Sequence, residues 1–311
     1  MVDVVVVGHV GRDLVLEVDD VPGPGAGAPV RARQERAGGA VNQAVAARQL
    51  GWSAALVAAV GDDDPGTAAL ADARADDIDV TGVVRRPGVP SALFVDVVPR
   101  DGARRLLEHV PEALGLTAGD VSAAAHLLEH ARAVIVQAQQ PSDAVRETVR
   151  IAAGAGALVV LDGATDRATL DDLLGRADVV RADATEAEQL LGRSLDGTED
   201  VVRAARNLVE SGAGCAALAT ADADVLAWPE GHVVLPHLGS APVDATGAGD
   251  AFVVGLVSAL LEGHDVEIAG SWGAAAAVLT VQHAGGRPDL SARAVGELAA
   301  RSRPNSQELP R

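Results

Sequence analysis

The sequence reads Asp244-Ala245-Thr246-Gly247-Ala248-Gly249-Asp250-Ala251-Phe252 immediately before an apolar run over 253–261. Small residues at 247–249 allow a tight turn, so that successive amide N–H groups point to one spot where a helix begins. Such a turn can bind an anion without a lysine. Asp250 would stand in the first helical turn, placed to accept a proton from a hydroxyl that attacks a bound phosphate. The simpler alternative, an aspartate-rich helix cap, is disfavoured because the pattern extends over nine residues.

Around this stretch, short β-branched runs alternate with helical patterns. The runs predict buried strands over 2–7, 54–59, 133–137, 157–161, 178–180 and 215–219. Helical patterns occupy 40–50, 67–75, 141–153, 184–191 and 199–211, and three more helices follow from Gly247 to near Arg301. This alternation is typical of an α/β fold with a mostly parallel central sheet and helices on both faces.

Two segments interrupt the alternation and predict a small β-sheet beside the main domain. Residues 14–36 are rich in Gly and Pro, and 91–110 read as a hairpin around a turn at 99–102. We interpret both segments as a lid that closes over the substrate. The alternative is that they are surface extensions of the domain without a role in binding. The predicted organisation is a core strand and substrate loop in 1–13, lid in 14–36, core in 37–90, lid hairpin in 91–110, core with the nucleotide-binding part in 111–301, and a disordered tail in 302–311.

The composition excludes several classes of function. The 311 residues carry a net charge of −19, which opposes a nucleic-acid partner because such binding rests on a basic surface. The chain contains no lysine, so neither a Walker-type loop nor a Schiff-base mechanism is available. The apolar runs are too short for a membrane span. A single cysteine, Cys215, and an N-terminus without a leader pattern lead us to expect a cytoplasmic protein.

Three motifs together resemble the ribokinase-like (PfkB-type) carbohydrate kinase family. The C-terminal signature of that family has the form Asp-Thr-x-Gly-Ala-Gly-Asp-x-Phe, which 244–252 resemble. The paired glycines Gly38-Gly39, followed by Asn42 and a small-residue helix, resemble its N-terminal signature, and Gly61-Asp62-Asp63 resembles its next loop. The resemblance covers nearly the whole chain and implies a three-layer α/β fold with a small β-sheet lid.

The resemblance also implies the residues that act on the acceptor. Asp250 would be the catalytic base, and the anion hole would consist of Gly247, Ala248 and Gly249. Asp13, which follows the first strand, would grip substrate hydroxyls. The full set of substrate-binding residues implied in this way is Asp13, Gly38, Gly39, Asn42 and Gln139. Ribokinases have a segment similar to Gln-x-Glu-x-Pro, whose glutamate binds the substrate. Gln139 takes the place of that glutamate here, so the resemblance does not imply specificity for ribose.

A Mg²⁺–ATP site is implied as well, and here the sequence departs from the family. The family's Asn-x-x-Glu segment reads Asp183-Ala184-Thr185-Glu186, and we expect Glu186 to hold Mg²⁺ through water. The nucleotide loop has lost both glycines and reads Ala221-Asp222-Ala223-Asp224. Both departures add carboxylates near a triphosphate, which weakens binding unless a metal offsets their charge. The predicted nucleotide-binding residues are Asp183, Glu186, Asp222 and Asp224.

A monovalent-cation site is the last feature that the resemblance implies. Asp244 and the backbone of Thr246, with the loop 281–286, resemble the site at which many family members hold a cation such as K⁺. A simple turn cap is an equal alternative for Asp244. We also expect a homodimer formed through the β lid.

We therefore expect a kinase that moves the γ-phosphate of ATP to a hydroxyl of a sugar or sugar-like substrate. Two alternatives stay open: a ligand-binding or regulatory protein with weak turnover, motivated by Asp183 and the glycine-poor loop, and a nucleoside kinase. With three Trp, two Phe and no Tyr, few rings are available to stack on a nucleobase, which favours a sugar. An oxidoreductase is disfavoured because the glycines at Gly8 and Gly11 lack the rest of a dinucleotide fingerprint.

Overall fold

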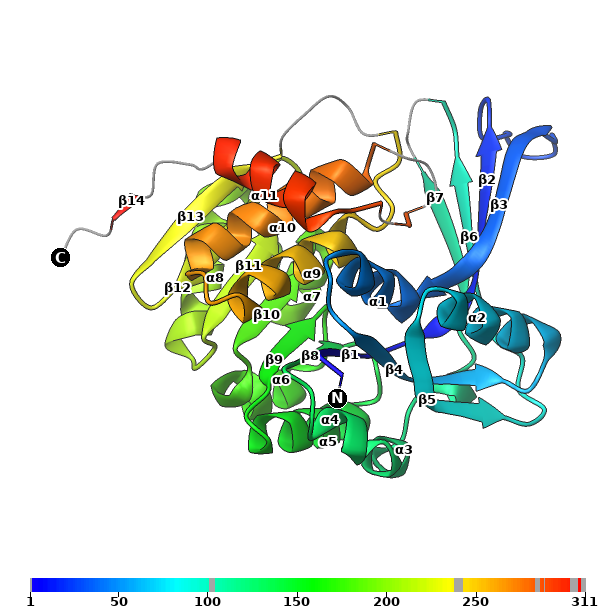
Figure 1. The fold of residues 1–311 in the computed structure, drawn as a ribbon. Coiled ribbons are helices and arrows are strands. Elements are labelled where there is room, and N and C mark those ends of the chain that lie inside the picture. The colour runs from blue at the N-terminus through cyan, green and yellow to red at the C-terminus, as the bar shows by residue number, and fades with distance from the viewer. Residues whose placement is uncertain are drawn as a thin grey trace.

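The computed structural model describes residues 2–100, 104–237, 243–282, 286–287, 289–302 and 307–308. They form an α/β core with a smaller sheet standing beside it (Figure 1). The mostly parallel central sheet, its helices and the second small sheet confirm the predicted fold class. Within the described part of the chain, no helix is both long enough and apolar enough to cross a membrane.

The central sheet is built around β1 (Val4–Val7), four valines that are at most 1 % exposed. Over the described residues it has ten strands, in the order β14-β13-β12-β11-β10-β9-β8-β1-β4-β5. The other strands are β4 (Ala54–Gly61), β5 (Ile78–Arg86), β8 (Ala133–Gln137), β9 (Leu158–Asp162), β10 (Val179–Ala182), β11 (Cys215–Ala219), β12 (Ala223–Trp228), β13 (Gly231–Pro236) and β14 (Gln307–Glu308). Strands β1, β4, β5 and β8 to β11 are parallel, whereas β12 to β14 pair antiparallel.

Alternate residues of β1 face opposite layers of helices, as the two-residue period of a strand requires. Val4 and Val6 belong to one buried cluster, and Val5 and Val7 to the other. The first cluster is covered by α1 (Ala40–Gln49), α2 (Asp64–Ala75), α9 (Ala248–Leu261), α10 (Val266–Thr280) and α11 (Ala292–Arg301). The second is covered by α3 (Ala118–Ala123), α4 (Ala125–Leu128), α5 (Ser142–Gly154), α6 (Arg167–Leu173), α7 (Ala184–Leu191) and α8 (Gly197–Glu210), with 3₁₀ turns at η1 (Glu112–Leu114) and η2 (Leu174–Arg176).

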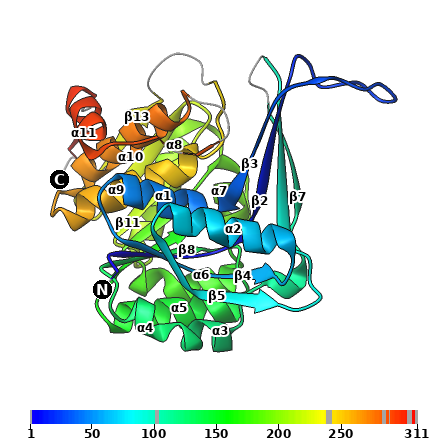
Figure 2. The same ribbon diagram turned by 45° about the vertical axis from the view of Figure 1, so that its right-hand side comes forward.

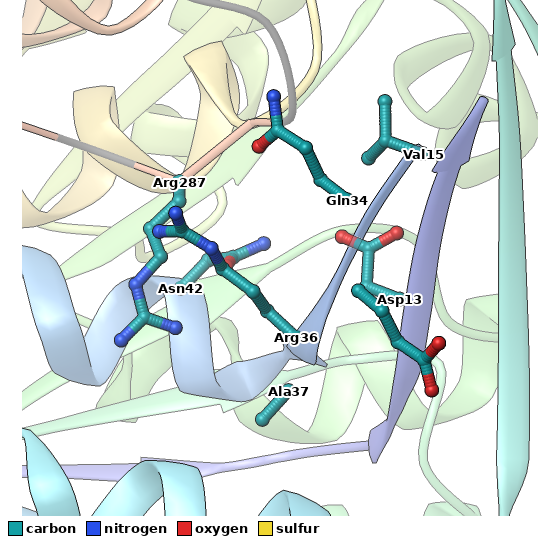
Figure 3. Close-up of a pocket in the computed structure, with 8 residues that line it drawn as sticks. Asp13, Val15, Gln34, Arg36, Ala37, Asn42 and Arg287 are labelled. Atoms are coloured by element: carbon teal, nitrogen blue, oxygen red, sulfur yellow. The ribbon is translucent and has the colours of Figure 1, made fainter. Parts of the chain in front are cut away.

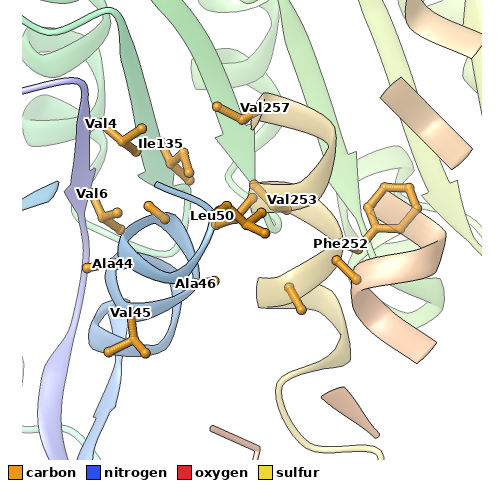
Figure 4. Packing of buried hydrophobic residues seen from close by; sticks show 14 of the residues in the cluster. Val4, Val6, Ala44, Val45, Ala46, Leu50, Ile135, Phe252, Val253 and Val257 are labelled. Atoms are coloured by element: carbon orange, nitrogen blue, oxygen red, sulfur yellow. The ribbon is translucent and has the colours of Figure 1, made fainter. Parts of the chain in front are cut away.

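Helices α1 and α9 pack against each other above the centre of the sheet (Figure 4). Ala44 and Ala46 of α1 are fully buried, and such small side chains let helices approach closely. Val253 and Val257 of α9 lie in the same cluster, at 1 % and 0 % exposure. This packing fixes the first turn of α9 relative to the first turn of α1, and both turns carry candidate functional side chains.

The small sheet, which we call the lid, projects beside the core (Figure 2). Its strand order is β3-β2-β6-β7, with β2 at Val10–Val18, β3 at Val30–Gly39, β6 at Ala92–Val98 and β7 at Arg105–His109. The lid strand begins at Val10, before the predicted lid segment 14–36, because β2 pairs with β6 from Gly11 onward. Asp13 therefore lies inside a strand and not in the predicted substrate loop. Residues 101 and 102 of the predicted turn, residue 103 of the predicted hairpin, and 303–306 and 309–311 of the predicted tail lie outside the described residues.

Gly39 joins the lid to the core, since β3 ends and α1 begins there. Its φ of +70° and ψ of −131° belong to a region that only glycine adopts readily. A Cβ at this position would lie 2.3 Å from the carbonyl oxygen of His9. The second glycine of the paired motif is therefore required by the connection between the two sheets.

We expect Gly39→Ala to lower the free energy of unfolding by about 3 kcal/mol or more, because the clash with His9 adds to the backbone strain. Gly51→Ala is the matched control: Gly51 has φ +96°, but a Cβ there meets nothing within 4 Å. The control should cost about 1 kcal/mol from the left-handed backbone alone. Urea unfolding of both variants measures the difference, and equal losses would show that the contact with His9 imposes no constraint.

Candidate active site

A cavity at the junction of lid and core brings together Asp13 of β2 and Asn42 of α1 (Figure 3). The two residues are 7 % and 5 % exposed. Gly38 backs onto Asp13, and a Cβ at Gly38 would lie 2.6 Å from the Asp13 Cβ. The first glycine of the pair therefore makes room for the carboxylate. The remaining lining residues are Val15, Gln34, Glu35, Arg36, Ala37 and Arg287.

The Asp13 carboxylate is poised to receive a hydrogen-bond donor. Its Oδ1 is buried and has no hydrogen-bond partner among the described residues. Burial raises the pKa of Asp13 to about 7; Asp96 and Asp244 add to this effect, and Arg104 opposes it. A buried acceptor without a partner costs free energy, which a substrate hydroxyl would recover.

The predicted anion hole lies where α9 begins. Gly247 is the N-cap residue, with φ +73°, and a Cβ there would meet the carbonyl oxygen of Gly286 at 2.0 Å. Ala248 and Gly249 open the helix, and no side chain caps its described N-terminus. Amide groups of an uncapped first turn are available to an anion, and the helix dipole favours negative charge there.

Asp250 follows in the first turn of α9 and is half-buried. Its carboxylate accepts hydrogen bonds from the side chains of Asn42 and Gln43 of α1. Burial and the neighbouring Asp162 raise the pKa of Asp250 to about 7, against the opposing effects of Arg181 and these hydrogen bonds. Because Asn42 also lines the Asp13 cavity, the candidate base borders the place where an acceptor would bind.

Three further residues belong to this site although no motif predicted them, namely Gln43, Asp162 and Arg181. Gln43 is fully buried and donates from Nε2 to Asp162 Oδ2 at 2.6 Å, and Arg181 donates to Asp162 Oδ1 at 3.2 Å. The Arg181 guanidinium also lies against the anion hole, since a Cβ at Gly249 would be 2.5 Å from one of its nitrogens. A fixed positive charge thus stands beside the first turn of α9.

A signal for two of them was present in the sequence. Asp162 is the last residue of β9, and Arg181 lies near the end of the neighbouring parallel strand β10. Ligand-binding residues of open α/β sheets gather at the carboxyl ends of such strands. Charged residues that end buried parallel strands were therefore candidates, even without a motif.

Glu186 lies on the same side of the site. It accepts a hydrogen bond from Gln139 Nε2 at 2.7 Å and lies 3.7 Å from Arg181. Burial raises its pKa. Asp183 forms the N-cap of α7, with Oδ1 accepting from the Glu186 N–H at 2.8 Å. The structure thus pairs Gln139 with Glu186, and Gln139 is not among the residues that line the Asp13 cavity.

Asp222 and Asp224 occupy different environments. Asp222 is exposed in the turn after β11, whereas Asp224 lies within β12 and not in the predicted loop. Asp224 pairs with His237 at 3.4 Å, a contact that raises the pKa of His237. Burial lowers the pKa of Arg181. The negative charges of Asp162, Glu186 and Asp224 have the larger combined effect, so the pKa of Arg181 is raised.

The predicted cation residues lie just before the anion hole. Asp244 is fully buried, and its Oδ1 accepts from the backbone N–H of Thr246 at 2.9 Å and from the Thr246 hydroxyl at 2.6 Å. Residues 283–285 of the associated loop lie outside the described residues. The cation site stays a prediction.

Known proteins resemble this chain over nearly its whole length. Residues 1–293 match a sequence model of the pfkB family carbohydrate kinases. The chain is 31 % identical over 300 residues to an ATP-dependent ribose-1-phosphate kinase of Halopiger xanaduensis, which covers 95 % of this chain and 97 % of that protein. It is 25 % identical over 297 residues to a bifunctional ribokinase/ribose-5-phosphate isomerase A of Fructilactobacillus sanfranciscensis, covering 94 % of this chain but only 55 % of that protein.

The fold is shared with a solved structure. An Arabidopsis thaliana ribokinase complexed with ribose and ATP matches with a TM-score of 0.77 at 24 % identity. The match covers 96 % of this chain and 98 % of that one, so lid and core are both included.

We expect Arg181→Gln to destabilise the protein more at pH 8 than at pH 5. Without Arg181, Asp162 loses its cation, and the pKa of Asp162, which burial already raises, rises further. A carboxyl whose folded-state pKa is raised contributes full stability at low pH, and that stability is lost as pH rises through the folded-state pKa. The loss should reach about 2–3 kcal/mol at pH 8.

Arg167→Gln serves as the control, because Arg167 forms an exposed pair with Asp171 on α6, with the arginine side chain 64 % exposed. That change should cost less than about 0.5 kcal/mol at either pH. Urea unfolding at the two pH values measures both variants. A pH-independent loss in Arg181→Gln would contradict the assignment of Arg181 as the partner of Asp162.

Proposed function

The chain belongs to the pfkB family of carbohydrate kinases, and from this premise we propose that it transfers the γ-phosphoryl group of ATP to a hydroxyl of a sugar or sugar-like acceptor. At the coarser level it is a ribokinase-like sugar or nucleoside kinase. One observation carries the proposal. Asp250 stands at the anion hole and is hydrogen-bonded to Asn42, which lines the cavity of Asp13.

The acceptor is held at the lid–core junction in this proposal. The unpartnered Oδ1 of Asp13 accepts a substrate hydroxyl, and Gly38 and Gly39 shape the backbone around it. The Arabidopsis structure contains ribose, and the Halopiger relative is named for a phosphorylated pentose. Neutral and phosphorylated pentoses are therefore both reasonable acceptors.

The nucleotide phosphates are bound at the anion hole, with Arg181 beside it. Arg181 supplies the fixed positive charge that a lysine supplies in other phosphate sites, and its planar guanidinium suits phosphate oxygens. Both carboxylate oxygens of Glu186 already accept hydrogen bonds, from Gln139 and from the Asp183 N–H. Glu186 thus fits a Mg²⁺ that keeps its waters, as the ion commonly does. When bound, Mg²⁺ neutralises charge on the transferring phosphate.

Asp183, Asp222 and Asp224 contribute less directly to nucleotide binding. Asp183 is engaged as the cap of α7, and Asp224 acts through Arg181 and His237. Asp222 is exposed at the edge of the site. Added negative charge here weakens nucleotide binding unless Arg181 and Mg²⁺ offset it.

The proton step belongs to Asp250. Above a pH of about 7 its carboxylate is ionised and can accept the proton of the attacking acceptor hydroxyl. Asn42 and Gln43 hold the carboxylate in place, and the amides of the first turn of α9 stabilise the charge that develops on the phosphoryl oxygens. A binding protein with weak turnover needs no base in this position, which favours the enzyme.

Three further features are part of the proposal. Asp244 and Thr246 hold a monovalent cation such as K⁺ behind the anion hole, and the lid sheet forms a homodimer. The exposed edge strand β7, with Leu106 at 40 % and Leu107 at 63 % exposure, supports the dimer. The chain acts in the cytoplasm, which the single buried cysteine, Cys215, supports.

Asp250→Asn is expected to lower kcat by at least about 100-fold, because general-base assistance contributes at least that much. Asn keeps the shape of the side chain, so Kd for the acceptor should change by less than about threefold. A coupled assay of ADP release measures kcat, and calorimetry measures Kd. Near-normal turnover in the variant would remove Asp250 from the mechanism.

The pH dependence gives an independent test. Below pH 7 both Asp13 and Asp250 become protonated, since each has a pKa raised to about 7. The logarithm of kcat/KM for the acceptor should therefore fall with a limiting slope near 2 per pH unit. In Asp13→Asn one ionisation is gone, and the slope should fall to about 1. A slope of 1 in both proteins would mean that the charge of Asp13 is not needed.

A further inference from the structure

We propose that the acceptor carries an anionic group, a phosphate or a carboxylate, bound between the guanidinium groups of Arg36 and Arg287 in the Asp13 cavity. This inference rests on the kinase activity proposed above and names the class of its substrate. It separates phosphosugars and sugar acids from neutral sugars.

The arrangement of Arg36 is the first observation. Arg36 of β3 lies directly opposite Asp13 of β2 in the antiparallel register, so an ion pair between them would be the ordinary outcome. No such pair forms. The Arg36 side chain instead extends toward Arg287, on the side of the cavity away from Asp13 (Figure 3). Asp13 and Arg36 are thus left available to different groups of one ligand.

Arg287 provides the second guanidinium. Its side chain is only 14 % exposed and pairs with Asp76 at the end of α2. Burial and the charge of Arg36 lower the pKa of Arg287, and Asp72 acts in the opposite direction. Two like charges that approach each other in a partly buried place repel unless an anion lies between them. Asp72 and Asp76 offset part of this charge from the α2 side.

Asp72 is already engaged with the backbone, since its Oδ2 accepts from the Ala37 N–H at 3.1 Å. Arg36 is exposed and makes no ion pair within the described residues. The cationic groups that face the cavity are therefore incompletely neutralised by the protein. Arginine is the residue suited to this task, because its planar group binds phosphate or carboxylate through two parallel hydrogen bonds.

There is room for such a group beside the cavity. The cavity itself measures only about 10 Å³, but Glu35 and Arg36 also line an adjoining groove of about 430 Å³ between the lid and α2. The groove is also lined by Arg12, which pairs with Glu35 at 2.5 Å, and by the carboxylates of Asp64 and Asp72 on α2. A sugar with hydroxyls on Asp13 can place its anionic substituent at Arg36, where the two spaces meet. The transferred phosphate is held elsewhere, at Gly249 and Arg181.

The test compares matched acceptors in the ADP-release assay at saturating Mg²⁺–ATP. The probes are ribose, ribose 1-phosphate, ribose 5-phosphate and ribonate. We expect one anionic acceptor to exceed ribose in kcat/KM by about 100-fold, as charge-assisted hydrogen bonds to two guanidinium groups allow. In Arg36→Gln, kcat/KM for that acceptor should fall by about 10–100-fold, and the value for ribose should change far less.

Arg31→Gln is the matched control, because it removes the same charge from β3 at a position that pairs with Glu17 and Asp19 and lines neither the Asp13 cavity nor the adjoining groove. The control should leave kcat/KM unchanged for every acceptor. Ribose that matches or exceeds all three anionic probes would overturn the inference and leave the kinase assignment standing. Equal losses for ribose and the anionic acceptor in Arg36→Gln would overturn it as well.

Binding provides a readout that does not depend on turnover. Calorimetry on Asp250→Asn measures Kd for the same four probes, with and without Arg36→Gln. Tighter binding of a phosphorylated or carboxylated pentose than of ribose, lost in the double variant, supports the inference even if no acceptor is phosphorylated. Absence of turnover with all probes would then count against the proposed kinase activity alone. Equal binding of all probes would refute the anion site.

Discussion

Gln43 links Asp162 to Asp250, and Arg181 pairs with Asp162, where the ends of β9 and β10 meet the first turns of α1 and α9. Burial raises the pKa of both carboxylates, and the positive charge of Arg181 opposes that rise in each of them. Moving any one of these elements would leave a buried charge without its partner. The packing of α1 against α9 therefore holds these charged groups in position as well as forming part of the core.

In the proposed function, an acidic chain without lysine binds anions by placing positive charge locally. At the anion hole this charge comes from backbone amides, the dipole of α9 and Arg181. At the lid it comes from Arg36 and Arg287. The two groups lie on different elements, one in the rigid core and one at the junction with the lid. Phosphoryl transfer and the choice of acceptor can thus be governed by separate sets of side chains.

The lid contributes to the site through its first two strands. Because β2 leaves the core directly after β1, Asp13 is carried on a strand that is paired on both sides and cannot move independently. Gly38 and Gly39 let β3 approach β2 closely and then turn into α1. The same short connection places Arg36, Asn42 and Gln43 within one continuous segment. In the proposed mechanism, acceptor binding, base positioning and lid attachment are consequently linked through β3 and α1.

From the sequence alone, the α/β alternation, the tight turn before Asp250 and the paired-glycine connection could be predicted, because these features depend on local backbone geometry and on the periodic burial of single elements. It did not place Asp13 within a lid strand, separate Asp224 from Asp222, or identify Gln43, Asp162, Arg181, Arg36 and Arg287. Asp162 and Arg181 become neighbours only through the order of β9 and β10, and Arg287 meets Arg36 although 251 positions separate them in the sequence. Such contacts between charged side chains leave no periodic pattern in the sequence. They exist only because the sheet order and the lid bring distant segments to one edge, and so only the tertiary structure could decide them.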